Sequence, residues 1–143
     1  MLGARNRVGL TDGQIRMCVE AWRFLCGRTP RLLDLSEAAQ HGSRTRYDER
    51  RRVVILGADV LSGAGQSANA RMSARACLAH ELAHLLRAEI GFQRPLALPD
   101  AHLDEAETSV HASFLKHLSR QDREDLVEDA RDRLIDWLAF PKE

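Results

Sequence analysis

The sequence predicts an α+β fold, in which helices pack on a short, mostly antiparallel sheet. Two observations lead to this class. Apolar residues recur at helical spacing in several long segments, whereas the apolar, partly β-branched run over residues 53–56 follows a charged turn, as in a hairpin. The chain has 143 residues, 44% of them apolar and 29% charged. This size and composition fit a single globular domain over residues 11–143, after a flexible N-terminal segment over residues 1–10.

Four segments carry the helical pattern. Thr11 is suited to cap a first helix that ends at Gly27, and Ser73 to cap a second, strongly apolar helix that runs to Glu89. We expect a third helix from Asp104 and a last one after Ser119. The positions of this last helix that should face the core are Leu126, Ala130, Leu134 and Trp137 or Leu138.

The remaining segments predict strands and loops. Residues 45–47 and 53–56 should pair as a hairpin around the charged turn at 48–51. Residues 31–40 read as extended at first and as helical from Ser36. The Gly- and Ser-rich stretch after residue 57 should be a surface loop, and the stretch over residues 91–103, which holds two prolines, a longer loop with a functional role.

Charge and hydropathy limit the compartments and the classes of partner that we expect for this protein. No apolar run is long enough to span a bilayer and the N-terminus lacks the apolar core of a signal peptide, so we expect a cytoplasmic protein without a membrane partner. Residues 1–56 carry eleven arginines against six acids, and the rest carries ten basic residues against fifteen acids. We expect these charges to cancel within one domain, and no helix-turn-helix or zinc-finger pattern indicates a nucleic-acid partner.

The most informative stretch is CLAHELAHLL, residues 77–86, which has the spacing His-Glu-x-x-His. On a helix, His80 and His84 project from one face and can offer two imidazole nitrogens to a single Zn²⁺ ion. Glu81 lies to the side, where its carboxylate can take a proton from water that the metal has acidified. The pattern therefore predicts two metal ligands and a general base.

A catalytic zinc site needs a third protein ligand and leaves the fourth position to water. The metzincin arrangement is excluded, because Arg87 and Ile90 stand where it requires Gly and His. A carboxylate from the following helix is the other common solution. Spacing alone leaves several candidates open, namely Asp104, Glu105, Glu107 and, less favoured, His102 or His111.

Residues 12–118 resemble the ImmA/IrrE family of metallo-endopeptidases. The resemblance rests on the hairpin, the approach ARMSARACLAHELAHLL and the downstream helix EAETSVHASFL. That family typically has Glu-x-Glu-Ala-Asn-x-Phe-Ala in this helix, and its first Glu binds zinc. The resemblance thus implies that Glu105 is the third ligand, Glu107 the second Glu and Ala112 the small packing residue. Thr108, Ser109 and His111 replace the usual Ala, Asn and Phe.

The resemblance also implies a fold and an activity. The fold would be a small zincin-like domain with the His-Glu-x-x-His helix at its centre. The activity would be that of an endopeptidase with one Zn²⁺ ion, which cleaves a specific cytosolic protein such as a helix-turn-helix repressor or a co-encoded partner. The alternative is a catalytically silent zinc-binding module that acts in protein–protein interaction.

The other candidate site residues lie outside the motif. Tyr47 and His111 could stabilise the oxyanion of the transition state, and a hydroxyl at Ser109 could hydrogen-bond a ligand. Zincins commonly hold a peptide as an added strand on a sheet edge. We expect that edge to be the strand over residues 53–56 with the residues that follow it. The candidate substrate-binding residues are Val54, Leu56, Gly57 and Ala58.

Overall fold

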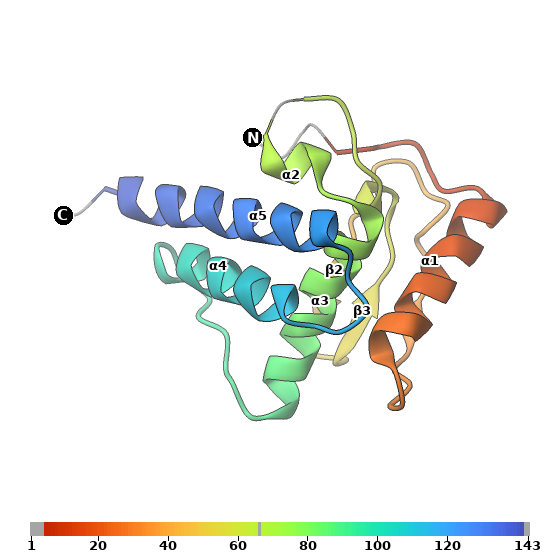
Figure 1. Cartoon of the computed structure of the whole chain (residues 1–143), viewed down its shortest axis with the longest axis horizontal. Coiled ribbons are helices and arrows are strands. Elements are labelled where there is room, and N and C mark those ends of the chain that lie inside the picture. The colour runs from red at the N-terminus through yellow and green to blue at the C-terminus, as the bar shows by residue number, and fades with distance from the viewer. Residues whose placement is uncertain (1–4, 66, 142–143) are drawn as a thin grey trace.

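Five α-helices and a three-stranded sheet make up the structure, a computed structural model that describes residues 5–65 and 67–141 (Figure 1). The α+β class is therefore confirmed. Within the described residues, no helix is long and apolar enough to cross a membrane. The elements in chain order are α1 (Asp12–Cys26), β1 (Leu33–Asp34), β2 (Arg46–Asp48), β3 (Val53–Ile55), the 3₁₀ turn η2 (Ala58–Val60), α2 (Ala68–Arg71), α3 (Ala74–Glu89), α4 (Asp100–Ser113) and α5 (Arg120–Ala139).

Local capping chemistry defines the helix ends. The Thr11 hydroxyl accepts a hydrogen bond from the Gln14 amide, and the Gln14 side chain returns one to Thr11, which completes a capping box at the start of α1. Gly27 ends α1 with a positive φ of 63°. Ser73 and Ser119 likewise accept from amides in the first turns of α3 and α5, so these three of the four predicted helix starts are confirmed. The fourth, expected at Asp104, is four residues too late, because α4 begins at Asp100.

The sheet contains the predicted hairpin and one strand more. β2 pairs antiparallel with β3, as expected, whereas β1 pairs parallel with β3 on its other side. The order β1-β3-β2 makes the sheet mixed rather than mostly antiparallel, and it makes β3 the central strand. The prediction that residues 53–56 form the free edge is therefore wrong. The helix expected from Ser36 is also absent, since residues 36–39 form turns.

The long loop before α4 is shorter than predicted. α4 begins at Asp100, one residue after Pro99, so residues 100–103 are helical and His102 lies on the helix. Its ring contacts Phe140, with 6.4 Å between the ring centroids. The prediction that residues 100–103, with His102, belong to the long loop is therefore wrong.

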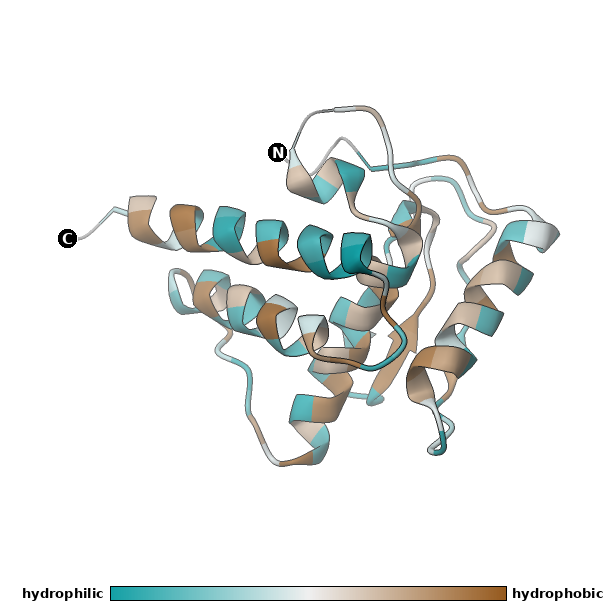
Figure 2. Cartoon of the chain, in the orientation of Figure 1, coloured by the Kyte–Doolittle hydropathy of each residue, from teal (hydrophilic) through white to brown (hydrophobic). Residues whose placement is uncertain are grey.

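The helices assemble around α3. It contacts α1 on one side, α4 and α5 on another, and also β2 and β3. α4 and α5 lie side by side, on the opposite side of the molecule from α1 (Figure 1). Strand β3 is hydrophobic along its length, while α5 alternates between hydrophilic and hydrophobic residues (Figure 2). Leu126 and Ala130 of α5 are buried as predicted, and of the alternatives Trp137 and Leu138 the tryptophan is partly buried, whereas Leu138 and Leu134 are exposed.

The N-terminal segment is anchored rather than free over its described part. The buried Arg5 guanidinium donates to the backbone carbonyls of Asp59, Val60 and Met72. Leu10 lies in the hydrophobic core. The prediction of a flexible segment is therefore wrong for residues 5–10, and residues 1–4 lie outside the described residues.

Candidate metal centre

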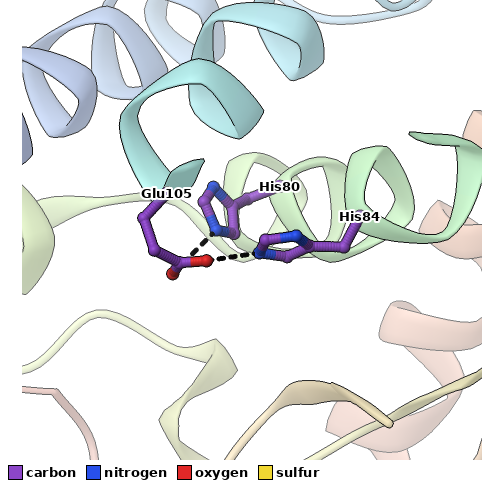
Figure 3. Close-up of side chains that lie close together, drawn as sticks. All are labelled: His80, His84 and Glu105. Carbon is purple, nitrogen blue, oxygen red and sulfur yellow. Dashed lines mark ion pairs between the residues drawn. The ribbon is translucent and has the colours of Figure 1, made fainter. Parts of the chain in front are cut away.

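Three side chains converge between α3 and α4. His80 and His84, four residues apart on α3, point to Glu105 on α4 (Figure 3). The distance from His84 Nε2 to Glu105 Oε1 is 2.6 Å, and that from His80 Nε2 to Glu105 Oε2 is 3.5 Å. Their ligand atoms all lie within 4.8 Å of one another, so this His-His-Glu group could hold a metal ion.

The hydrogen bond at the far side of the His80 ring fixes its tautomer. His80 Nδ1 lies 2.7 Å from Ser109 Oγ, and Ser109 Oγ donates to Asp129 Oδ2 at 2.5 Å. A hydroxyl has one proton, which Ser109 gives to the carboxylate, so the hydroxyl must accept from His80 Nδ1–H. In the neutral ring that a metal requires, the lone pair then lies on Nε2 and faces Glu105.

The same reasoning applies to His84. Thr108 Oγ1 donates its proton to the backbone carbonyl of Asp104 at 2.8 Å and accepts from Arg87 Nη1 at 2.5 Å. His84 Nδ1, at 3.4 Å from this oxygen, is therefore on the donating side. Burial lowers the pKa of His84 to about 4, so the ring is neutral near pH 7. Its Nε2 lone pair also faces Glu105.

Two imidazole lone pairs and one carboxylate thus face one another. Burial alone would raise the pKa of Glu105, but its contacts with His80 and His84 hold that pKa well below its ordinary value, so the carboxylate is ionised. His80 Nε2 is buried and has no hydrogen-bond partner among the residues that the structure describes. The low pKa of Glu105 depends on a proton on a ring nitrogen that faces it. With both rings neutral and protonated on Nδ1, the two Nε2 atoms and the carboxylate are instead three acceptors facing one another, and a buried unpaired acceptor costs about 1–3 kcal/mol. A divalent cation placed between them pairs all three acceptors, so the residues fit a metal.

Glu81 lies beside the His-His-Glu group without belonging to it. Its side chain lines the same pocket, and its Oε1 accepts a hydrogen bond from the Tyr47 backbone N–H at 3.0 Å. Desolvation in the pocket raises the pKa of Glu81 to about 7. The sequence prediction placed this carboxylate next to the metal ligands, and the geometry agrees with that position.

Two arginines complete the surroundings of Glu105. Arg94 Nη2 lies 3.1 Å from Glu105 Oε1, and Arg133 Nη1 lies 3.2 Å from Glu105 Oε2. Arg133 also binds Asp129, the carboxylate that accepts from Ser109. The third-ligand candidate and the hydroxyl that orients His80 are therefore joined through one guanidinium.

The other third-ligand candidates are engaged elsewhere or lie outside the group. Asp104 is buried in ion pairs with Arg87 and Arg94, and Glu107 is half-exposed in a pair with Arg87. His111 lies on the exposed side of α4 and does not line the pocket. Of the alternatives that spacing left open, the structure brings Glu105 alone to both histidines, among the described residues.

Tyr47 is brought to the site, whereas the predicted substrate-binding residues are not. The Tyr47 ring lines the pocket and stacks on His84, with 6.2 Å between the ring centroids. The residues on or after β3 are buried and do not line the pocket, because β3 is paired on both sides. An added peptide strand cannot reach them there. The residues to which this correction applies are Val54, Leu56, Gly57 and Ala58.

Sequence reasoning missed several residues of this centre. Ser109 was anticipated as a ligand partner, but Thr108, Asp129 and the two arginines on Glu105 were not. One signal was present: Asp129 and Arg133 fall on the helix face of Leu126 and Ala130, where an acid and a base four residues apart interrupt an apolar stripe. A buried carboxylate at such a position needs a partner.

The fold and the site together define a small α+β domain whose pocket holds a His-His-Glu group able to bind a metal ion. No family model, curated protein or solved structure matches this chain. The chemistry of the pocket is therefore the basis for assigning a function.

Proposed function

We propose that the protein is a zinc-dependent endopeptidase. The observation that carries this proposal is the orientation of the two imidazoles. In each neutral ring Nδ1–H donates to a hydroxyl oxygen, so that the lone pair on Nε2 faces Glu105. Two histidines and one carboxylate are one of the ligand sets found in catalytic zinc sites, which keep a fourth position open. When bound, zinc would supply the Lewis acidity that lowers the pKa of water toward neutrality.

Glu81 is the proposed general base. Its carboxylate lies in the pocket one residue from His80, outside the ligand set. The Tyr47 amide fixes one of its oxygens, so that the other is free to take a proton from water and to pass it to the leaving amine. A site that holds zinc only for structure has no use for such a carboxylate.

The substrate would lie against β2 instead of β3. β2 is an edge of the sheet, and the pocket is lined by Arg46 and Tyr47 of this strand and by the residues just before it. The amides of Thr45 and Tyr47 already donate to Asp59 and Glu81, so a protein segment running past the metal along β2 would be held by side chains more than by a ladder of backbone hydrogen bonds. The Tyr47 phenol would then be available to the oxyanion. A repressor or a co-encoded protein is the expected substrate by resemblance to the ImmA/IrrE family alone.

The test compares two isosteric substitutions on α3. Glu81→Gln should keep the zinc content and the melting temperature and lose cleavage of co-encoded candidate proteins. Glu89→Gln is the matched control, because Glu89 ends the same helix in a surface pair with Arg31. An active Glu81→Gln protein would disprove the general-base role. Wild-type protein that binds one zinc and cuts no candidate would favour the catalytically silent module.

A further inference from the structure

The pocket beside the His-His-Glu group is strongly basic. Its volume is about 570 Å³. Three carboxylates contribute to its lining, those of Asp59, Glu81 and Glu105. Twice as many arginines do so, namely Arg5, Arg7, Arg44, Arg46, Arg94 and Arg133. A divalent cation bound to the group would add to this positive charge.

The arginines differ in whether a carboxylate neutralises them. Arg94 and Arg133 form ion pairs with Glu105. The buried guanidinium of Arg5 donates to backbone carbonyls, and it forms no ion pair with any residue of 5–65 and 67–141. Its charge therefore contributes to the potential of the pocket without being held in a direct ion pair.

Three of the arginines form what we call the basic wall: Arg7, Arg44 and Arg46. All three are exposed, and they come from two chain segments that the hydrogen bond from the Gly42 amide to the Arg7 carbonyl, 2.8 Å long, holds together. Arg7 and Arg44 form no ion pair with any described residue, and Arg46 pairs with Glu37. The basic wall is thus a surface with at least two uncompensated charges.

The basic wall also shows how the charge asymmetry of the sequence is distributed in space. The wall comes from residues 7–46, in the arginine-rich part of the chain, whereas α3, α4 and α5 supply the facing side with the His-His-Glu group. The expected cancellation of charge within the domain therefore does not hold at this pocket.

We propose that the basic wall binds an acidic segment of the substrate and holds it beside the metal group. This inference rests on the proposed function, for which it names the chemistry of the substrate. A peptide fits better than a nucleic acid, because the wall borders the group for which peptide cleavage is proposed. Arg46 lies on the edge strand β2, where the Tyr47 amide already donates to Glu81, so charge pairs would hold the peptide more than strand pairing. The wall also lacks an aromatic platform for bases, since Tyr47 is buried against His84.

Binding is measured on zinc-loaded Glu81→Gln protein, so that cleavage does not interfere. The probes are a short fluorescein-labelled peptide rich in glutamate, its glutamine counterpart, its lysine counterpart and a single-stranded DNA of similar length. Fluorescence anisotropy gives the Kd of each probe at low and high salt. The glutamate peptide should bind most tightly, and its affinity should fall as salt rises from about 0.05 M to about 0.5 M, because exposed charges are screened.

The variants locate the binding surface. Arg7→Glu combined with Arg44→Glu should weaken binding of the glutamate peptide by about tenfold or more, because two attractive charges become repulsive. Arg16→Glu on α1 makes the same kind of charge change at an exposed residue that does not line the pocket, and should leave the Kd unchanged. Circular dichroism spectra of the variants establish that each is folded.

Three results would overturn the inference. Equal affinity for the glutamate and glutamine peptides would show that the wall does not recognise negative charge. Tighter binding of the DNA than of the glutamate peptide would show that the wall is a nucleic-acid surface. If removal of zinc abolished binding while the Arg7→Glu, Arg44→Glu variant still bound the peptide, the peptide carboxylates would bind the metal and not the wall. None of these results contradicts the peptidase proposal, which depends on cleavage. Conversely, charge-dependent binding without any cleavage by wild-type protein would leave this inference standing and refute the enzyme.

Discussion

Replacing Ser109 with alanine should weaken zinc binding by about ten- to a hundredfold. The hydroxyl accepts from His80 Nδ1 at 2.7 Å, and Ser109 is completely buried. Without it, zinc on Nε2 forces the ring proton onto Nδ1, where it has no acceptor. A buried unsatisfied donor costs about 1–3 kcal/mol, and at about 1.4 kcal/mol per tenfold in affinity this range contains the expected loss.

The metal-free protein should be affected less than the zinc complex. Without zinc, the His80 proton can move to Nε2 and face Glu105 Oε2, 3.5 Å away, so the ring keeps a partner. The penalty of Ser109→Ala therefore falls mainly on the metal-bound state. Competition against a chromophoric chelator gives the zinc Kd, and urea unfolding of the apoprotein gives its stability.

A matched control separates the loss of this contact from the loss of a serine. Ser113 lies one turn later on α4 and donates to the Val110 carbonyl, away from the pocket. Ser113→Ala should leave the zinc Kd unchanged. If Ser109→Ala binds zinc as tightly as Ser113→Ala, the tautomer argument that supports the metal site is refuted.

Three further predictions concern the fold and its coupling to the metal. Gly57→Ala should lower the free energy of unfolding in urea by about 3 kcal/mol, because the added Cβ would lie 2.3 Å from the Arg44 carbonyl carbon. Gly13→Ala is the control, since a Cβ there meets no such close contact, and it should not lower the free energy of unfolding. Equal losses in the two variants would contradict the close approach at Gly57. Leu126→Ala should cost about 2–5 kcal/mol because the side chain is fully buried, whereas Leu138→Ala, at a residue 71% exposed, should change stability by less than about 0.5 kcal/mol. Zinc at a hundred times its Kd should raise the free energy of unfolding by about 2.7 kcal/mol, with a matching rise in Tm in calorimetry that a chelator reverses, and an unchanged Tm would argue against the site.

The parts of the fold that sequence predicts well are those decided by neighbouring residues. Thr11, Ser73 and Ser119 each place a side-chain oxygen where it accepts from an amide of the first helical turn. The hairpin is similarly local, since its two strands are joined by four residues, 49–52. Such signals need no knowledge of the rest of the molecule.

The parts that failed depend on contacts between distant residues. β1 has only two residues, and its parallel pairing with β3 joins positions about twenty residues apart, which no short pattern encodes. This single pairing moves β3 from the edge to the centre of the sheet, and with it the surface on which a peptide could pair. The burial predicted for Leu134 and Leu138 was wrong for a related reason. Both have helical spacing, but the packing of α5 in the described residues leaves Leu138 exposed and covers Leu134 only in part.

Within the site, the helix period was sufficient to predict how His80, Glu81 and His84 lie relative to one another, because residues within about one turn of a helix have fixed relative directions. Glu105 followed from a resemblance, and the structure brings it to both histidines. Asp129 and Arg133 come from α5, which the sequence treated only as a core helix. Their approach to Glu105 and Ser109 depends on how α4 and α5 pack, and that packing was not predictable from spacing.

Two of the three residues of α4 that differ from the ImmA/IrrE pattern have a physical role in this chain. Thr108 and Ser109 are adjacent, so their side chains point in directions about 100° apart on the helix, and each reaches a different histidine. Each hydroxyl gives its proton away, Thr108 to a backbone carbonyl and Ser109 to Asp129, and is left as an acceptor. A hydroxyl that kept its proton could instead donate to the ring and place the imidazole lone pair on the wrong nitrogen. The buried carboxylate of Asp129 therefore belongs to the candidate metal centre, because by accepting from Ser109 it leaves the proton of a neutral His80 on Nδ1 and the lone pair on Nε2, which faces Glu105.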